Sequence, residues 1–134
     1  MLVMEFDGAC RNGTPGCGGY GVVIKKDGRI IDELAGSIRN MDGLTNNRAE
    51  YIALIIGLKY LKVHYPGRSV ICRGDSRVVI NQMIGESSVN NDNLFDLWKK
   101  ASKVANKMNV SFEWIERDRN KRADELSRRR IPVP

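Results

Sequence analysis

Cysteine is scarce in this chain of 134 residues, and the three present are Cys10, Cys17 and Cys72. Their odd number, behind an N-terminus without the apolar core of a secretion signal, argues against a disulfide framework. We therefore expect reduced thiols and a cytoplasmic location. No apolar run reaches the roughly 18 residues that a membrane-spanning helix needs, so we expect no membrane partner.

The composition is that of an ordinary globular protein, with 42% hydrophobic and 28% charged residues. The length suits one domain with a single core. We expect residues 1–131 to form that domain, residues 132–134 to be a loose tail, and the protein to be a monomer. The net charge of +6 suits a polyanionic partner, although basic proteins without such a partner are common.

Alternating apolar residues and turn signals predict a mixed α/β order along the chain. Strands are predicted at residues 2–7, 20–26, 29–38, 69–73 and 110–114, and helices at residues 45–62, 77–84, 94–108 and 120–130. Asp27-Gly28 predicts a hairpin, whereas residues 11–19 are too rich in glycine for a helix or a ladder. Interleaved strands and helices predict a mixed sheet covered on its faces.

The predicted helix at residues 45–62 carries one carboxylate, Glu50, on its apolar side. The small and apolar residues within about 60° of Glu50 on a helical wheel are Ala53, Leu54, Gly57 and Leu61. The cations on the far side are Arg48, Lys59 and Lys62. An inward carboxylate is costly unless it meets a metal ion or a hydrogen-bond donor.

A second interpretation of Glu50 is structural. We expect an asparagine to cap this helix, and Asn47 followed by Glu50 three residues later matches a capping box. A glutamate near a helix N-terminus is also favourable by itself. The helix alone leaves both interpretations open.

Three further acids favour the metal interpretation. Asp7 and Asp75 each end a predicted strand and are followed by a small residue, and Asp124 lies on a helix that must pack against the sheet. Parallel neighbouring strands would bring Asp7 and Asp75 side by side at their carboxyl ends. Clustered carboxylates without histidine or cysteine suit Mg²⁺ or Mn²⁺, and two such ions could assist a phosphoryl displacement.

Five motifs together resemble type 1 ribonuclease H, in the right order and over essentially the whole chain. They are Met4-Glu5-Phe6-Asp7-Gly8-Ala9-Cys10, Gly18-Gly19-Tyr20-Gly21, Thr45-Asn46-Asn47-Arg48-Ala49-Glu50, Gly74-Asp75-Ser76 and Asn120-Lys121-Arg122-Ala123-Asp124-Glu125-Leu126. Each motif alone is weakly specific, and their combination is strong.

The resemblance implies a ribonuclease H-like fold, a five-stranded mixed sheet in the order 3-2-1-4-5 with strand 2 antiparallel and helices on both faces. It implies endonucleolytic cleavage of the RNA strand of RNA/DNA hybrids, leaving 3′-hydroxyl and 5′-phosphate ends. Asp7, Glu50, Asp75 and Asp124 match the catalytic, metal-binding acids of the family, with two Mg²⁺ or Mn²⁺ ions per site and Asp7 between them. Double-stranded RNA stays open as a second substrate.

Substrate-binding residues also follow from the resemblance. The matching positions are Cys10, Asn12, Thr14, Asn46, Asn47, Arg77 and Asn81, of which Arg77 and Asn81 replace glutamines of well-known members. Simpler interpretations remain for several of them. Asn46 and Asn47 could cap the helix, Cys10 could be a small loop residue, and the lysines of residues 94–108 could form a solvated face.

The chain departs from the family pattern in two places. Some members carry a lysine-rich protrusion where residues 85–93 contain no cation, so we identify a form that lacks the basic protrusion. Many members place a histidine before the last helix, where this chain has a shorter loop containing Arg117 and Arg119. Either arginine could replace the histidine by binding phosphate.

Two other functions share the fold. A non-catalytic nucleic-acid-binding module would usually have lost an acid, and this chain retains all four. A transposase or integrase core would normally carry additional DNA-binding segments, for which 134 residues leave no room. We therefore expect a nuclease.

Overall fold

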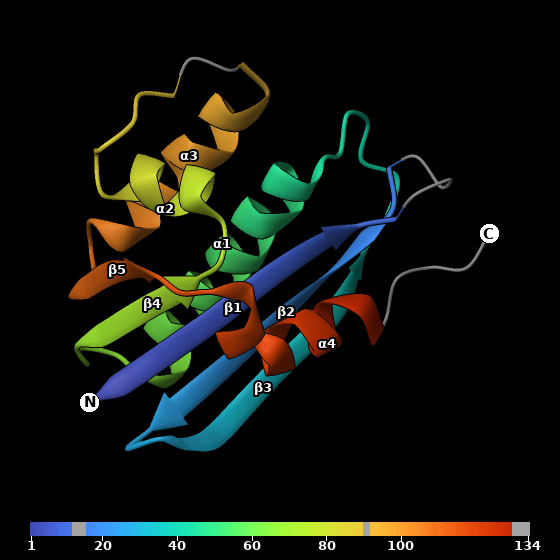
Figure 1. The fold of residues 1–134 in the computed structure, drawn as a ribbon. Coiled ribbons are helices and arrows are strands. Elements are labelled where there is room, and N and C mark those ends of the chain that lie inside the picture. The colour runs from blue at the N-terminus through green and yellow to red at the C-terminus, as the bar shows by residue number, and fades with distance from the viewer. Residues whose placement is uncertain (12–15, 90–91, 130–134) are drawn as a thin grey trace.

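The computed structural model describes residues 1–11, 16–89 and 92–129. The predicted tail at residues 132–134 lies outside the described part of the chain. No helix in the described part is long and apolar enough to cross a membrane. The elements follow one another in the predicted order (Figure 1).

Five strands form one sheet in the order β3-β2-β1-β4-β5, as predicted. They are β1 (Leu2–Cys10), β2 (Gly18–Lys26), β3 (Arg29–Ile38), β4 (Val70–Gly74) and β5 (Val110–Trp114). β2 runs antiparallel to β1 and β3, whereas β4 lies parallel to β1 and β5 parallel to β4. The carboxyl ends of β1 and β4 therefore point the same way.

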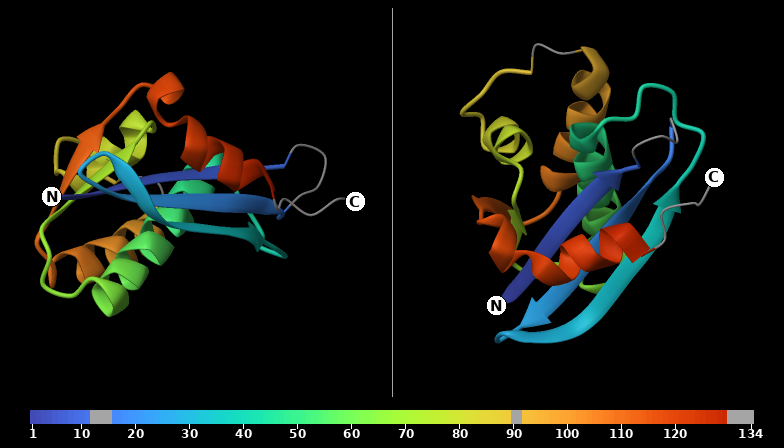
Figure 2. Two further views of the ribbon diagram at one scale, coloured as in Figure 1. Left: turned by 90° about the horizontal axis from the view of Figure 1, so that it is seen from below. Right: turned by 45° about the vertical axis from the view of Figure 1, so that its right-hand side comes forward.

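Helices cover both faces of the sheet (Figure 2). They are α1 (Asn46–His64), α2 (Arg77–Met83), α3 (Asp92–Ala105) and α4 (Lys121–Arg129), and a 3-10 turn, η1 (Arg117–Arg119), precedes α4. α1 lies on β1 and β2, with α3 packed against α1, and α4 crosses the opposite face over β2, β1 and β3. α4, near the C-terminus, therefore packs against β1, near the N-terminus.

The core lies mainly between β1 and α1. Leu2, Met4 and Phe6 alternate along β1 and are fully buried, because every second side chain of the strand faces α1. Gly57 of α1 makes room for Met4, since a Cβ atom there would lie 2.4 Å from the Met4 sulfur. This close packing fixes the height at which α1 sits above the sheet.

The predicted hairpin is present, whereas the predicted loop at residues 11–19 is wrong at its C-terminal end. Asp27 and Gly28 have φ values of 51° and 79°, which both central residues of a tight hairpin turn require, and they join β2 to β3. Gly18 and Gly19, predicted as loop, instead belong to β2 and pair with Cys10 and Ala9. A Cβ atom at Gly18 would lie 2.2 Å from the Ala9 carbonyl oxygen, so the missing side chain permits this pairing.

The predicted asparagine cap of α1 is wrong. Thr45 is the N-cap, and its hydroxyl accepts a hydrogen bond from the Arg48 amide at 3.2 Å. Asn46 and Asn47 are already helical, which leaves their side chains available for other contacts. The prediction that Arg48 faces solvent is also wrong, because its side chain is only 12% exposed and pairs with Asp96 of α3 at 3.3 Å.

Candidate active site

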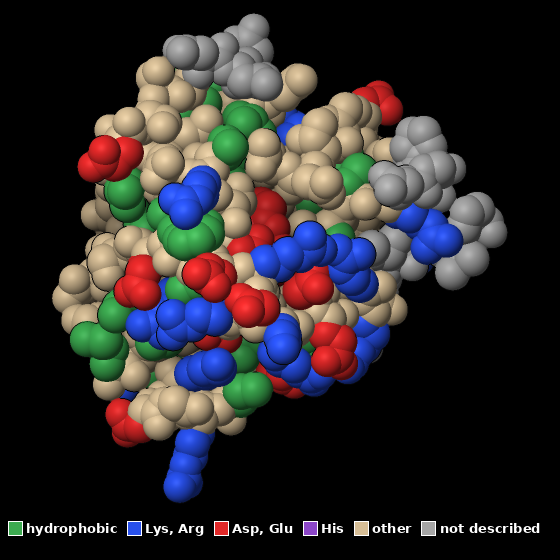
Figure 3. Space-filling view, in the orientation of Figure 1, with side chains coloured by type: hydrophobic (Ala, Val, Ile, Leu, Met, Phe, Trp, Pro, Cys, Tyr) green, Lys and Arg blue, Asp and Glu red, His purple; other side chains and the backbone are tan. Residues whose placement is uncertain are grey.

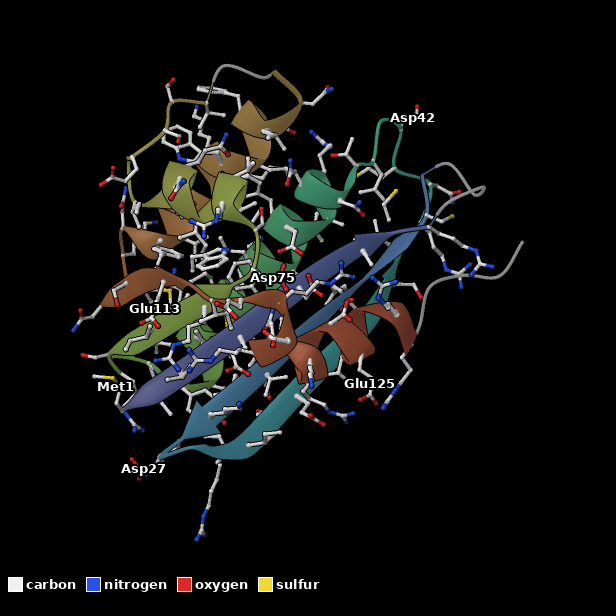
Figure 4. All side chains as sticks on the ribbon, in the orientation of Figure 1. Met1, Asp27, Asp42, Asp75, Glu113 and Glu125 are labelled. Carbon is white, nitrogen blue, oxygen red and sulfur yellow. The ribbon has the colours of Figure 1, made fainter. Side chains whose placement is uncertain are left out.

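Three of the four predicted acids converge at the carboxyl ends of β1 and β4. Asp7 lies on β1, Glu50 on the first turns of α1 and Asp75 directly after β4, and one carboxylate oxygen from each lies within 4.8 Å of the others. Figure 4 shows Asp75 between the end of β4 and the middle of β1. The parallel pairing of β1 with β4 produces this proximity, as the sequence predicted.

Gly8 holds two of these acids. Its backbone N–H donates to Asp7 Oδ1 at 3.1 Å and to Glu50 Oε1 at 3.0 Å. A Cβ atom at Gly8 would lie 2.1 Å from the Ala49 carbonyl carbon, so only glycine lets β1 approach the backbone of α1 this closely. The glycine of the Asp-Gly motif therefore joins the strand acid to the helix acid.

The other two acids are held from the C-terminal part of the chain. The Asn120 side-chain amide donates to Asp75 Oδ2 at 3.1 Å. Asp124, on α4, accepts a hydrogen bond from Arg128 Nε at 3.0 Å, one helical turn away. Asp124 lines the same cavity as the other acids but lies outside the cluster of three.

Burial and mutual repulsion change the acidity of this group. Burial, supported by the charges of Asp75 and Asp124, raises the pKa of Asp7 to about 7, although an interaction with Glu50 partly opposes the shift. Burial and the neighbouring Asp7 raise the pKa of Glu50 well above its ordinary value. Burial also acts to raise the pKa of Asp124, but the hydrogen bond and charge of Arg128 outweigh it and lower the pKa.

The donor set fits a divalent cation. Glu50 Oε2 is buried and has no hydrogen-bond partner among the described residues. The hydrogen bonds to Asp7, Glu50 and Asp75 come from an amide N–H or a side-chain amide, and none comes from a lysine or arginine of the described residues. Three close carboxylates that no basic side chain pairs with form the oxygen-rich site that Mg²⁺ or Mn²⁺ prefers.

The acids lie at the bottom of an open cavity of about 390 Å³. It is lined by Asp7, Gly8, Ala9, Cys10, Asn46, Asn47, Glu50, Asp75, Ser76, Arg117, Asp124 and Arg128. In Figure 3 acidic side chains occupy a recess near the middle of the face, with lysine and arginine side chains on both sides. An anionic polymer could thus be held by the rim while its backbone reaches the acids.

The predicted substrate-binding residues are only partly brought together. Cys10, Asn46 and Asn47 line the cavity; the Asn46 side chain accepts from the Cys10 amide at 3.0 Å, and Asn47 accepts from the Ser76 hydroxyl at 3.3 Å. Arg77 and Asn81 lie on α2 and do not line it. Asn12 and Thr14 lie outside the described residues.

Arg77 has a different arrangement from the one expected. Its guanidinium lies 3.7 Å from the centre of the Trp114 ring, and the Trp114 indole N–H donates to the Asp75 carbonyl oxygen at 3.1 Å. Stacking on an aromatic ring restricts a guanidinium without neutralising it. Arg77 therefore presents an oriented positive charge beside the segment that carries Asp75.

The predicted site residues did not include Gly8 and Ala9, which line the cavity, nor Ser76, Asn120 and Arg128. Ser76 caps α2 by accepting from the Val79 amide, a role that the Gly-Asp-Ser order before a helix could have revealed. Arg128 follows Asp124 by four residues, a spacing that predicts an ion pair on a helix. Asn120 carries no such local signal.

The structure separates the two arginines that could replace the family histidine. Arg117 lines the cavity, whereas Arg119 does not, although both belong to η1. His64, the single histidine, is exposed at the C-terminal end of α1 and does not line the cavity either. The geometry favours Arg117 for a contact with phosphate.

We predict that Arg117→Ala slows the RNA cleavage expected from the sequence by roughly 10- to 100-fold, the range that loss of one hydrogen bond to a charged group allows. Arg119→Ala and His64→Ala should each change the rate less than about twofold, because neither side chain reaches the cavity. Single-turnover rates on one hybrid compare the three variants. A loss confined to His64→Ala would show that the placement of α1 is incorrect.

Comparison with known proteins places this chain in a family. The reverse transcriptase-like family model matches residues 5–130. Ribonuclease H of Neisseria gonorrhoeae is 33% identical over 146 aligned positions, covering 96% of this chain and 93% of that protein. A bifunctional protein of Mycobacterium tuberculosis is 36% identical over 129 positions, covering 94% of this chain and 34% of that protein.

Solved structures agree with the sequence comparison. LC11-RNase H1 in complex with an RNA/DNA hybrid superposes with a TM-score of 0.87 at 32% identity, covering 98% of this chain and 96% of that one. RNase H1 of the halophilic archaeon Halobacterium salinarum gives a TM-score of 0.83 at 33% identity, covering 94% of this chain and 93% of that one.

The chain belongs to the type 1 ribonuclease H family, whose members are metal-dependent hydrolases. It spans about a third of the length of the mycobacterial relatives that it matches and nearly all of the neisserial ribonuclease H. The predicted fold and the predicted ribonuclease H class are thereby confirmed.

Proposed function

We propose that this protein is an endoribonuclease that cleaves the RNA strand of RNA/DNA hybrids and leaves 3′-hydroxyl and 5′-phosphate ends. The observation that carries the proposal is the cluster of Asp7, Glu50 and Asp75 within 4.8 Å, in a cavity open to a polymer. The hybrid held by the related LC11-RNase H1 supports the choice of substrate.

Asp7, Glu50 and Asp75 would hold the divalent cations, and Asp124 would join them from α4. We propose that these cations are Mg²⁺ or Mn²⁺, two ions per site, because the donors are hard carboxylate oxygens. When bound, such ions supply Lewis-acid stabilisation of the charge that develops in a phosphoryl displacement. The protein itself keeps the four acids in place around the position of the cations.

Four residues of the cavity would orient the hybrid over the acids, namely Asn46, Asn47, Cys10 and Arg117. Their side chains or backbone amides line the cavity rim, where they can contact sugars and phosphates. Contacts to 2′-hydroxyl groups would select the RNA strand. We propose that the enzyme acts as a monomer in the cytoplasm, and double-stranded RNA stays open as a second substrate.

A cleavage assay tests this function. The protein is incubated with an RNA/DNA hybrid, double-stranded RNA and double-stranded DNA of one sequence, each with Mg²⁺, Mn²⁺ or a chelator, and the product ends are mapped. We expect metal-dependent cuts within the RNA of the hybrid. Binding of the hybrid without cleavage under every condition would instead support the alternative, a non-catalytic nucleic-acid-binding module.

We also predict that hybrid binding is strongly salt-dependent and nearly independent of sequence. Phosphate contacts release counterions, so the logarithm of the affinity should fall linearly with the logarithm of the salt concentration. Titrations of inactive Asp7→Asn protein with unrelated hybrids at several salt concentrations measure the slope. Arg117→Ala should reduce that slope by about one phosphate contact. A response that does not change with salt would contradict the proposed recognition.

A further inference from the structure

Asn120 connects β1, which carries Asp7, to the side chain of Asp75. It is fully buried, and its side-chain Nδ2 donates both to the Phe6 carbonyl oxygen at 3.0 Å and to Asp75 Oδ2 at 3.1 Å. Phe6 directly precedes Asp7 in β1. One amide group therefore contacts the strand that carries the first acid and the side chain of the third.

The orientation of this amide is determined by its partners. Both acceptors lie at Nδ2, which has two hydrogen atoms to donate. Rotating the amide by 180° would place Oδ1 against the Phe6 carbonyl oxygen and the Asp75 carboxylate, which would repel it. In the observed orientation Oδ1 is buried without a hydrogen-bond partner among the described residues. An unpaired buried acceptor is costly, so the residue is poorly explained by stability alone.

The backbone of Asn120 extends the connection to Asp124. The Asn120 N–H donates to the Arg117 carbonyl oxygen at 3.0 Å, and the Asn120 carbonyl oxygen accepts from the Asp124 N–H at 3.0 Å. The residue thus lies between η1 and α4 and is hydrogen-bonded to both. A shift of Asn120 would move Asp75 and Asp124 relative to Asp7 together.

We propose that Asn120 is a positioning residue that sets the distance between Asp75 and the other acids and thereby the affinity of the site for divalent cations. The proposal rests on the proposed function only in that the acids bind metal. Removing a residue that orients metal ligands typically weakens metal binding or activity by about 10- to 100-fold. Affinity for the hybrid itself should change little, because Asn120 lies beneath the cavity and does not line it.

Asn120→Leu and Asn120→Ala test this role. Leucine fills a similar volume without any donor, and alanine removes both donors without adding bulk. For each variant we measure the Mg²⁺ midpoint, the Mg²⁺ concentration that gives half of the maximal effect. It is measured twice, from the rise in melting temperature with Mg²⁺ and from the cleavage rate. We expect both midpoints to increase by roughly 10- to 100-fold, with the hybrid KM within about twofold of wild type.

Gln82→Met is the matched control. Gln82 is also a buried amide, and its side-chain oxygen accepts from the Tyr51 hydroxyl at 2.6 Å, but it does not line the cavity. This variant should lose stability while keeping the wild-type Mg²⁺ midpoints. If leucine is not accommodated, Asn120→Ala alone carries the test, because it removes the same donors with less steric change.

The proposal is wrong if either measurement gives wild-type Mg²⁺ midpoints for the folded Asn120 variants. Asn120 would then be a structural residue. Wild-type protein that is stabilised by Mg²⁺ yet cleaves no hybrid would overturn the proposed function instead. The thermal measurement needs no cleavage, so the two failures are distinguishable.

Discussion

Asp7→Asn should abolish cleavage and at the same time stabilise the metal-free protein at neutral and alkaline pH. Asparagine keeps an oxygen for the Gly8 amide, so the hydrogen bond of 3.1 Å can persist. The negative charge that repels Glu50 and Asp75 is lost. We expect the cleavage rate to fall by at least about three orders of magnitude, as happens when one member of a catalytic unit is removed.

The stability effect has a defined pH window. The pKa of Asp7 rises on folding from 3.8 to about 7, so the folded state binds this proton more tightly than the unfolded state. The contribution of Asp7 to the free energy of unfolding of wild type therefore decreases as pH rises from about 4 to about 7, and then levels off. The variant lacks this decrease, so its advantage is absent near pH 4 and reaches on the order of 1–3 kcal/mol above pH 7.

Urea unfolding in chelator at several pH values measures this effect, and Glu5→Gln is the control. Glu5 is buried two residues earlier on the same strand, but it pairs with Lys25 at 3.1 Å. Its neutralisation should lower stability and leave cleavage largely intact. A clear loss of stability in Asp7→Asn above pH 7 would mean that Asp7 has a structural role.

Gly8→Ala should damage both the fold and the site. The added Cβ atom would lie 2.1 to 2.4 Å from three backbone atoms of Ala49 and Glu50, and backbone cannot rotate away as a side chain can. Either β1 and α1 separate or the first turns of α1 shift. We expect a loss of stability of about 1–3 kcal/mol, as in other overpacked cores, and a cleavage rate at least about 100-fold lower, because Glu50 moves with its helix.

Gly67→Asn controls for the loss of a glycine. Gly67 has a φ of +73° in an open turn, where a Cβ atom would meet no other atom within 4 Å, and asparagine tolerates this conformation. Thermal melts and single-turnover cleavage should show little change in this control. Wild-type cleavage by Gly8→Ala would mean that the contact between β1 and α1 does not position Glu50.

The acids could be predicted from the sequence because their positions follow from local rules. Asp75 directly follows β4, and the helical period places Glu50 on the inward face of α1. The sequence predicts that Asp7 ends its strand, but β1 continues to Cys10, and Asp7 instead lies just past the residues of β1 that pair with β4. The N-cap prediction fails because Thr45, Asn46 and Asn47 are all good capping residues, and only the backbone decides among them. Asn120 could not be assigned, because its partners Phe6 and Asp75 are 114 and 45 residues away in the chain.

The hydrogen bond between Asn120 and Phe6 also bears on the order of folding. It closes a loop of 114 residues, and contacts at such sequence separation are slow to form. β1, α1 and β4 contain Asp7, Glu50 and the approach to Asp75, so they can pack before the C-terminal residues take part. The fourth acid joins only when α4 docks across β1 and β2. A chain still emerging from the ribosome would therefore carry an incomplete site, and nuclease activity would begin only after residue 124 and its helix are in place.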